Sequence, residues 1–349
     1  MKILYLSYTD VDLSLNAVYI KGLRQNGVEV LDFFPDNLGF GKYLQIGRYY
    51  FQNRKGADFI IVANNCPGLA IWMSVISRKV IIYNALCSVM ERLIISRRVA
   101  SRYSLKYVYY WFLDYFACKF SDLIMVESDH QLEFFRHTFK VPKNKLFLAW
   151  TGVDEDKFYY DPVTKKFDKF TVVFRGRLLP EAGGDAVVGA AKKLENEDID
   201  FIMLAAGQEL PKIKTLIAEL QPKNLKLITD FLPVDAVREM MQKVHLSLGQ
   251  LSNHERLQRT IPHKAYETLA LKTVYLTARN PAIMELLTEN ENCLACNPSD
   301  PADLAQKILW ARAHQEELEE IAGKGFELYE TRLRPKTLAK AFLDRIRQT

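Results

Sequence analysis

Long apolar runs are absent from this sequence, and cysteine is scarce. Although 49% of the 349 residues are hydrophobic, no uninterrupted apolar stretch reaches the roughly 18 residues that a membrane-spanning helix requires. The first residues, MKILYLSY, contain neither a long apolar core nor a small-residue cleavage site, so we expect no signal peptide. The five cysteines are an odd number scattered among apolar runs. We therefore expect buried thiols and a reducing, cytoplasmic compartment.

Signatures of metal and dinucleotide sites are missing as well. The one C-x-x-C, from Cys293 to Cys296, has no second cysteine pair and no histidine at a spacing that would complete a zinc site. Two Asp-x-Asp stretches, Asp10–Asp12 and Asp154–Asp156, are interpreted as strand-end turns and helix caps, so we predict no metal. Neither half of the chain has G-x-G-x-x-G after its first strand, which disfavours a hydride-transfer enzyme.

The net charge of the sequence indicates which kinds of partner the protein binds. The formal net charge is +5 and the isoelectric point is about 8.7. This mildly basic balance suits an acidic partner, such as a nucleoside diphosphate or an anionic membrane surface. It is too small to predict nucleic-acid binding.

Short apolar strands alternate with helices along the whole chain, which is typical of an α/β protein with parallel sheets. In the first half, we predict strands at residues 2–7, 28–34, 59–63, 80–86, 123–126 and 146–150. A polar stretch at residues 161–169 interrupts the pattern, which then resumes from residue 171. We predict two Rossmann-like domains, residues 1–165 and 166–332, that face each other across a cleft.

The segment RTIPHKAYETLALKTVYL, residues 259–276, is the strongest candidate for chemistry. Thr260 is a predicted N-cap, and Pro262 falls in the first turn of the helix that follows. The unpaired N–H groups of such a helix start favour an anion. Lys264 and Glu267 lie three residues apart on one helix face, where they would suit a phosphate and ribose hydroxyls. The alternative is an ordinary surface helix with an ion pair between these two residues.

A second candidate stretch, RGRLLPEAGGD at residues 175–185, follows the first strand of the second half. Arg177 is placed to reach a diphosphate, and Gly183 and Gly184 permit close approach of the backbone. Taken alone, this stretch is no more than a basic strand end. Together with residues 259–276, in this order along the chain, it becomes a more specific signal.

Both stretches resemble the nucleotide-binding motifs of the group 1 retaining glycosyltransferases, which have the GT-B fold. The residues that match those motifs are Gly176, Arg177, Leu178, Gly183, Pro262, Lys264, Glu267, Ala270 and Glu285. The resemblance implies that Arg177 and Lys264 neutralise the leaving diphosphate and that Glu267 holds the donor ribose. It also implies a metal-independent reaction, with no cofactor beyond a UDP- or GDP-linked sugar donor.

The same resemblance extends to other parts of the chain. Phe231 and Leu232 match the family's loop over the nucleotide base, and the C-terminal helix, residues 333–349, would cross back to the first domain. Three family positions differ, with Ala182 in place of a lysine, Arg259 in place of a glutamate and Arg279-Asn280 in place of two glycines. These differences motivate the alternative of a catalytically weakened homologue that binds a sugar nucleotide or a partner protein.

The stretch NALCSVMERLIISRR, residues 84–98, follows a first-domain strand and resembles the acceptor side of the same family. Ser88 and Glu91 take the places of a serine and an aspartate there. We predict that Glu91 accepts a hydrogen bond from the incoming hydroxyl or acts as its base. A surface ion pair between Glu91 and Arg92 at a helix start explains the pattern about as well.

Residues 97–120 are basic at their start and aromatic along their length. Core packing of a long helix accounts for the helical spacing of Val108, Trp111, Phe112, Tyr115 and Phe116. The alternative is a peripheral contact with an anionic membrane at the inner face of the cell membrane, where lipid-linked acceptors are found. The cations that suit this contact are Arg97, Arg98, Arg102 and Lys106.

The resemblance implies a retaining glycosyltransferase that moves a hexose from a nucleoside-diphosphate sugar to the hydroxyl of a glycan or lipid-linked acceptor. The setting that we expect is bacterial cell-surface glycan or glycolipid synthesis. Two alternatives remain open, the weakened homologue and a nucleotide-sugar epimerase on the same fold.

Overall fold

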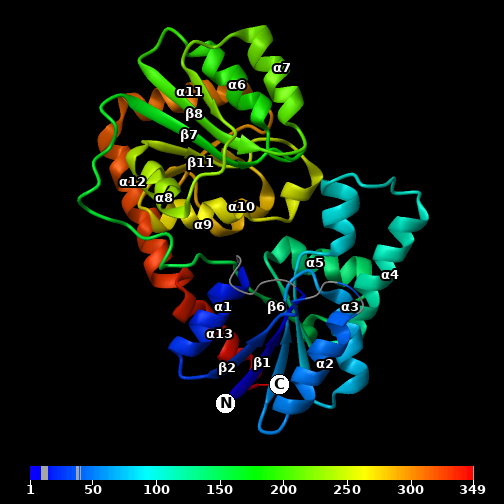
Figure 1. Ribbon diagram of the computed structural model, residues 1–349. Coiled ribbons are helices and arrows are strands. Elements are labelled where there is room, and N and C mark those ends of the chain that lie inside the picture. The colour runs from blue at the N-terminus through cyan, green and yellow to red at the C-terminus, as the bar shows by residue number, and fades with distance from the viewer. Residues whose placement is uncertain (9–14, 37–38, 40, 349) are drawn as a thin grey trace. The chain divides into compact units, whose positions relative to one another are not determined.

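The computed structural model describes residues 1–8, 15–36, 39 and 41–348, and these form two compact units (Figure 1). The N-terminal unit comprises Met1–Asp154 and Leu333–Thr349, and the C-terminal unit comprises Glu155–Arg332. The division falls after Asp154, earlier in the chain than the expected boundary after residue 165. The last helix belongs to the N-terminal unit, because it packs there rather than on the unit that precedes it in the chain.

The N-terminal unit is built on a six-stranded, fully parallel sheet with the order β2-β1-β3-β4-β5-β6. Its strands are β1 Lys2–Leu6, β2 Glu29–Phe33, β3 Phe59–Val62, β4 Val80–Leu86, β5 Leu123–Val126 and β6 Leu146–Leu148. The central strands are continuous apolar runs, as expected of a sheet that is covered on both faces.

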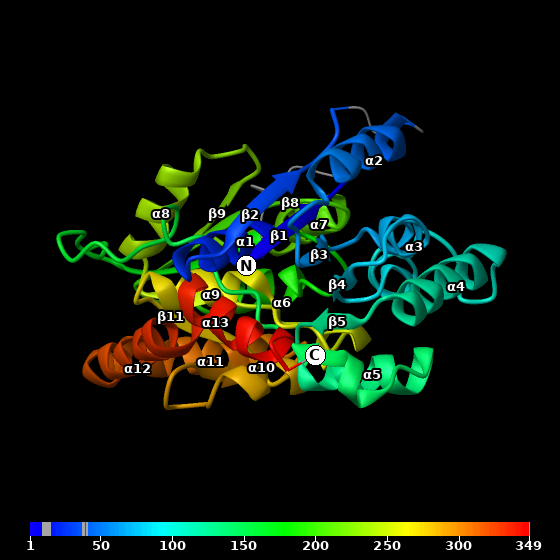
Figure 2. The ribbon, with the colours of Figure 1, turned by 90° about the horizontal axis from the view of Figure 1, so that it is seen from below.

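Helices cover the two faces of this sheet according to the right-handed crossover rule. They are α1 Leu15–Gln25, α2 Gly41–Asn53, α3 Pro67–Ile76, α4 Leu105–Phe120, α5 Asp129–Phe139 and α13 Pro335–Ile346. Helices α1 and α13 pack against each other on one face, whereas α3, α4 and α5 form a continuous layer on the other (Figures 1 and 2). A short π-helix, Glu91–Ser96, lies between β4 and α4.

The C-terminal unit repeats the architecture with a second six-stranded parallel sheet, in the order β12-β11-β10-β7-β8-β9. Its strands are β7 Phe170–Arg177, β8 Ile199–Ala206, β9 Leu225–Ile228, β10 Leu246–Leu248, β11 Val274–Ala278 and β12 Leu294–Cys296. Its helices are α6 Gly184–Lys193, α7 Leu210–Leu220, α8 Val234–Lys243, α9 His263–Ala270, α10 Pro281–Leu286, α11 Pro301–Ala313 and α12 Gln315–Leu328. Two parallel sheets with flanking helices confirm the predicted α/β fold class.

Each unit has its own hydrophobic core between sheet and helices. The five cysteines, all of them among the described residues, are buried and form no disulfide, as expected from their apolar surroundings. Burial raises the pKa of Cys66 to about 11 and the pKa of both Cys293 and Cys296 to about 12, so these thiols stay protonated at neutral pH.

Within the described residues, none of the helices combines the length and the apolar character needed to cross a bilayer.

Candidate functional site

A cavity of about 390 Å³ opens in the C-terminal unit where three neighbouring strands, β7, β8 and β9, end. This is the edge at which parallel α/β sheets bind their ligands. The side chains and backbone that line it are Phe158, Arg175, Gly176, Arg177, Leu204, Ala205, Ala206, Thr229, Asp230, Phe231, Leu232, Val234 and Val237. Four of the predicted site residues, Gly176, Arg177, Phe231 and Leu232, therefore lie around a single hollow.

Arg175 is the site residue that sequence reasoning missed. Strand β7 continues to Arg177, beyond the expected end at Phe174, so Arg175 and Arg177 are both strand residues and their side chains share one face. Arg177 is exposed at the strand end, whereas Arg175 is largely covered. The two-residue spacing in the letters RGR carried this signal, since alternate residues of a strand point the same way.

The Arg175 guanidinium binds the carboxylate of Glu267 on α9. It also lies over the ring of Phe158, with Cζ 5.6 Å from the ring centroid. Burial lowers the pKa of Arg175 to about 10, which leaves the group charged at neutral pH. Its buried Nε has no hydrogen-bond partner among the described residues. Arg175 thus connects the cavity to the predicted ribose-binding carboxylate.

Glu267 is buried in α9 and accepts from two groups rather than pairing with Lys264. Besides Arg175, its Oε1 lies 3.2 Å from Nδ1 of His263. Burial, and secondarily the charge of Arg175, lowers the pKa of His263 to about 4, so this imidazole is neutral and donates from Nδ1. The alternative of a surface ion pair between Lys264 and Glu267 is wrong, because both side chains are buried and have other partners.

Lys264 reaches across from α9 to the end of β7. Its Nζ donates to the carbonyl oxygen of Gly249 at 3.2 Å and lies 4.1 Å from the centroid of the Phe174 ring. It also lies 3.7 Å from the position that a Cβ on Gly176 would occupy, so the ammonium group is next to the cavity wall. Burial, followed by repulsion from Arg175, lowers the pKa of Lys264 to about 7.

The start of α9 differs from the expected one. The helix begins at His263, and its N-cap is Pro262, which has no side-chain cap. Thr260, the predicted N-cap, instead accepts a hydrogen bond from Nε of Arg256 at 3.2 Å. Pro262 is buried and is not part of the cavity lining. The first-turn N–H groups therefore have no side-chain oxygen to cap them.

Two predicted base-binding residues lie at the rim of the cavity. Phe231 and Leu232 are in the loop between β9 and α8, and 92% of the Phe231 side chain is exposed. Gly176 has φ +142°, a conformation that residues with a Cβ rarely adopt, which explains the glycine between the two arginines. The flat, exposed ring of Phe231, beside the half-buried backbone of Gly176, is suited to stacking on a nucleobase.

Glu285, in α10, is half-buried and is not among the residues that line the cavity.

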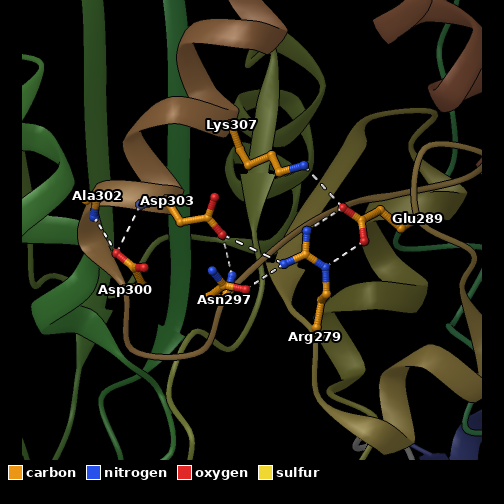
Figure 3. A network of polar contacts seen from close by, with 7 residues as sticks. All are labelled: Arg279, Glu289, Asn297, Asp300, Ala302, Asp303 and Lys307. Atoms are coloured by element: carbon orange, nitrogen blue, oxygen red, sulfur yellow. Dashed lines mark hydrogen bonds and ion pairs between the residues drawn. The ribbon is translucent and has the colours of Figure 1, made fainter.

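Arg279, which replaces a glycine of the family, has a structural role (Figure 3). Its Nε and Nη2 donate to the carboxylate of Glu289 at 2.6 and 2.7 Å, and its Nη1 donates to Asn297 at 2.9 Å. Lys307 donates to the same Glu289 at 3.2 Å. This network ties β11 to α11 and uses the guanidinium fully within the protein.

The two glycines before α6 serve packing. A Cβ on Gly183 would lie 2.6 Å from the backbone nitrogen of Ser252, and one on Gly184 would lie 2.9 Å from the side chain of Leu178. The space beside Gly183 is thus filled by the Leu251–Ser252 backbone rather than open to a diphosphate. Ala182, at the family's lysine position, is buried.

Glu91, the predicted acceptor-side residue, lies in the N-terminal unit in the π-helix after β4. It has no exposed surface, and its Oε2 accepts a hydrogen bond from Nε2 of Gln131 at 2.9 Å. Ser88 accepts a hydrogen bond from the Glu91 backbone N–H at 3.0 Å. The alternative of a surface pair with Arg92 is therefore wrong, whereas the base role of Glu91 stays a prediction.

Of the two Asp-x-Asp stretches, Asp10–Asp12 lies outside the described residues. In the second, Asp154 lies 3.7 Å from Nζ of Lys21. In the described part of the chain, no three His, Cys, Asp or Glu residues are grouped so that they could hold a metal ion.

Residues 157–327, almost the whole C-terminal unit, match the family model described as glycosyl transferases group 1. The similarity to this family therefore lies in the C-terminal unit. No curated protein matches the chain.

Solved structures similar to the whole chain extend the likeness to both units. Anabaena Alr3699/HepE in complex with UDP and glucose is 15% identical, covers 100% of both chains and has a TM-score of 0.76. Sucrose-phosphate synthase from Thermosynechococcus elongatus is 13% identical, covers 100% of this chain and 99% of that one, and has a TM-score of 0.79. A glycosyltransferase from Rickettsia africae is 12% identical, with coverage of 99% and 98% and a TM-score of 0.70. The fold is GT-B.

Proposed function

We propose that this protein is a retaining, metal-independent glycosyltransferase that moves a hexose from a UDP- or GDP-linked sugar to an acceptor hydroxyl. The observation that carries the proposal is the cation group at the cavity. Arg175, Arg177 and Lys264 come from one strand end and the facing helix, beside a cavity of about 390 Å³. The fold neighbour Anabaena Alr3699/HepE was crystallised with UDP and with UDP-glucose, which supports a nucleotide-sugar donor.

Three cations suit the charge change of this reaction. Breaking the bond between sugar and diphosphate leaves negative charge on the phosphate, and positioned donors that meet this charge lower the barrier. Arg177 and Lys264 would contact the diphosphate, as predicted from the motifs. The lysine expected at position 182 is an alanine, and Arg175, whose charge is balanced by Glu267, adds N–H donors beside the cavity. Each well-placed donor typically lowers the activation free energy of such a step by about 3 kcal/mol.

The neutral parts of a donor have matching partners. Glu267 would accept from the ribose hydroxyls, because an ionised carboxylate has about four acceptor positions and the two protein donors do not fill them. Phe231 and Leu232 would cover the base at the rim, and the Gly176 backbone would lie against the phosphates. Glu285 and Pro262 would act indirectly, through the positions of α10 and α9.

The acceptor that we propose is a glycan or lipid-linked hydroxyl in bacterial cell-surface glycan synthesis, at the cytoplasmic side of the membrane. Glu91 of the N-terminal unit, which accepts a hydrogen bond from Gln131, would accept a hydrogen bond from the incoming hydroxyl or act as its base. The basic and aromatic helix α4 of the same unit supports an acceptor that resides at a membrane.

Donor hydrolysis tests the proposal without knowledge of the acceptor. The protein should release UDP or GDP slowly from a UDP- or GDP-sugar, and Arg177→Ala or Lys264→Ala should reduce that rate by about 100-fold or more. The control is Lys214→Ala, which removes an exposed lysine from α7, away from the cavity lining.

The outcomes separate the proposal from its alternatives. Tight nucleotide binding without release would favour the weakened homologue, for which Ala182 and Arg259 are the supporting observations; Arg259 donates to Glu255 at 3.3 Å. Conversion of the donor to an isomeric sugar nucleotide would favour epimerisation. Release that is unaffected by both Arg177→Ala and Lys264→Ala would contradict the proposed site.

A further inference from the structure

Helix α4 turns its apolar side chains outward. In the sequence, Val108, Phe112 and Phe116 have the spacing of a core-facing stripe, but in the structure all three are exposed. Trp111 and Tyr115, the other members of the expected core stripe, are half-buried. The expectation of core packing is confirmed for Trp111 and Tyr115, which pack against the N-terminal core, and is wrong for Val108, Phe112 and Phe116.

The exposed side chains form one continuous surface, which we call the α4 face. Its members and their exposed fractions are Tyr103 100%, Leu105 88%, Val108 46%, Tyr109 61%, Phe112 47%, Phe116 37% and Phe120 44%. The steps of three or four residues from Leu105 onward place them on one side of the helix. Phe112, Phe116 and Phe120 stack in sequence, with ring centroids 6.1 and 5.8 Å apart.

The inward side of α4 is held by a buried acid. Asp114 accepts hydrogen bonds from the backbone N–H groups of Val89 and Met90, at 3.1 and 2.8 Å. Ala117 and Cys118 are buried beside it. This polar anchor fixes which side of the helix faces the protein, so the aromatic side cannot turn inward without the loss of both bonds. The outward aromatics are thus a stable feature of the unit.

Charge on and around this face is positive. Residues 92–121 contain six arginines and lysines but only one acid, Asp114, which is buried. The exposed cations are Arg98, Arg102, Lys106 and Lys119. A helix that presents aromatic rings flanked by cations, with no exposed acid, has the composition of an interfacial membrane helix.

We propose that the α4 face docks this protein onto an anionic lipid bilayer, with the aromatic rings at the headgroup level and the cations on lipid phosphates. Charge complementarity favours this partner over a second copy of the chain, because two α4 faces would bring their cations together. Lipid contact also explains the exposed rings, which would be a liability in contact with water alone. The proposal goes beyond sugar transfer and needs no donor for its test.

Vesicle co-sedimentation of the full chain tests the docking. With vesicles containing about one part in three phosphatidylglycerol, the protein should bind at low salt and dissociate at about 0.5 M salt, and it should bind phosphatidylcholine vesicles far more weakly. Lys106→Gln with Lys119→Gln should weaken binding about fivefold per lysine, or about 25-fold together. Phe112→Ser with Phe116→Ser should weaken it by about tenfold or more.

Matched controls separate docking from general charge and from misfolding. Lys214→Gln with Lys226→Gln removes two exposed lysines from the C-terminal unit and should leave vesicle binding unchanged. A variant is compared with the wild type only if it unfolds at the same temperature. Lys106→Gln with Lys119→Gln provides a test of docking that removes no apolar contact.

Two outcomes would overturn the proposal. One is the absence of binding to either vesicle, or binding that none of the α4 substitutions alters. The other is a wild-type dimer in sedimentation equilibrium that Phe112→Ser with Phe116→Ser converts to a monomer, without any vesicle binding, since the α4 face would then join two copies.

Discussion

Arg175 and Lys264 show how two cations can be held close together inside a protein. Arg175 is neutralised by Glu267, whereas the partners of the Lys264 ammonium group among the described residues are carbonyl oxygens and an aromatic ring. An ion without a counter-ion in a covered position is costly to keep charged. The lowered pKa of Lys264, about 7, follows from that difference. An anionic ligand would supply the missing negative charge.

This difference predicts a pH dependence of nucleotide binding. The charged form of Lys264 attracts a diphosphate, and above its pKa of about 7 the free amine is neutral and must take up a proton when the ligand binds. The affinity for UDP or GDP should therefore fall as pH rises from 7 to 9, by at most about tenfold per pH unit. Isothermal titration calorimetry in buffers of different ionisation enthalpy would measure both the affinity and the proton uptake.

Lys264→Met is the control for this dependence. It keeps a long apolar side chain in the buried position but cannot titrate. The variant should therefore bind UDP or GDP weakly, and its affinity should not fall as the pH rises above 7. An equal slope in the wild type and in Lys264→Met would assign the dependence to another group.

The elements around the site are positioned by close backbone packing. The loop before α6 contributes a glycine, Gly183, at a point where other backbone approaches. Gly183 has φ +72° and is the N-cap of α6, with the backbone of Leu251 and Ser252 directly against it. Its contribution is to the packing of the loop against the turn after β10.

Gly183→Ala should therefore destabilise the protein by about 2 kcal/mol or more, since it combines a left-handed φ with a backbone contact that cannot move freely. The matched control is Gly323→Ala in α12, where a Cβ meets nothing within 4 Å. There, the substitution should raise the free energy of unfolding by about 0.5–1 kcal/mol, because alanine has the higher helix propensity. Urea unfolding measures both, and equal stability of the two variants would contradict the packing role of Gly183.

Helix α4 is the element for which hydrophobic spacing was misleading. A stripe of aromatics at steps of three and four predicts a covered face, but it does not say what covers it. Asp114 fixes the orientation, because a helix turned the other way would leave the backbone N–H groups of Val89 and Met90 without their acceptor. Pattern alone would have placed Asp114 on the solvent side.

At the scale of the whole molecule, the chain returns to the unit in which it began. Helix α13 packs against α1, and the carbonyl oxygen of Pro335 lies 2.0 Å from the position that a Cβ on Gly22 would occupy. Its buried side chains belong to the N-terminal core, and they include Leu338, Phe342, Leu343 and Ile346. The C-terminal core contains none of them.

Deletion of residues 334–349 should therefore unfold the N-terminal unit selectively. Loss of four large core side chains, at about 2–5 kcal/mol each, is comparable to the whole stability of a domain. Calorimetry should show the transition of the C-terminal unit at its original temperature, and nucleotide binding should persist because the cavity lies within residues 158–237. A parallel fall of both transitions would show that the units do not depend separately on this helix.

The sequence by itself determined the alternation of strands and helices, the two-sheet fold and the nucleotide motifs. These are local patterns, since apolar strands, helix periodicity and the residues of RGR and PHKAYE can be recognised within short windows. For the same reason Arg177, Lys264 and Glu267 could be named before the fold was known.

Only the tertiary structure decided which of these residues meet. Arg175 became a site residue because β7 runs three residues past its expected end and α9 presents Glu267 to it. Gly183 and Arg279 became structural residues because segments distant in sequence fill the space around them. Contacts between distant segments follow from how the sheets and helices pack, and a linear pattern contains no record of that packing.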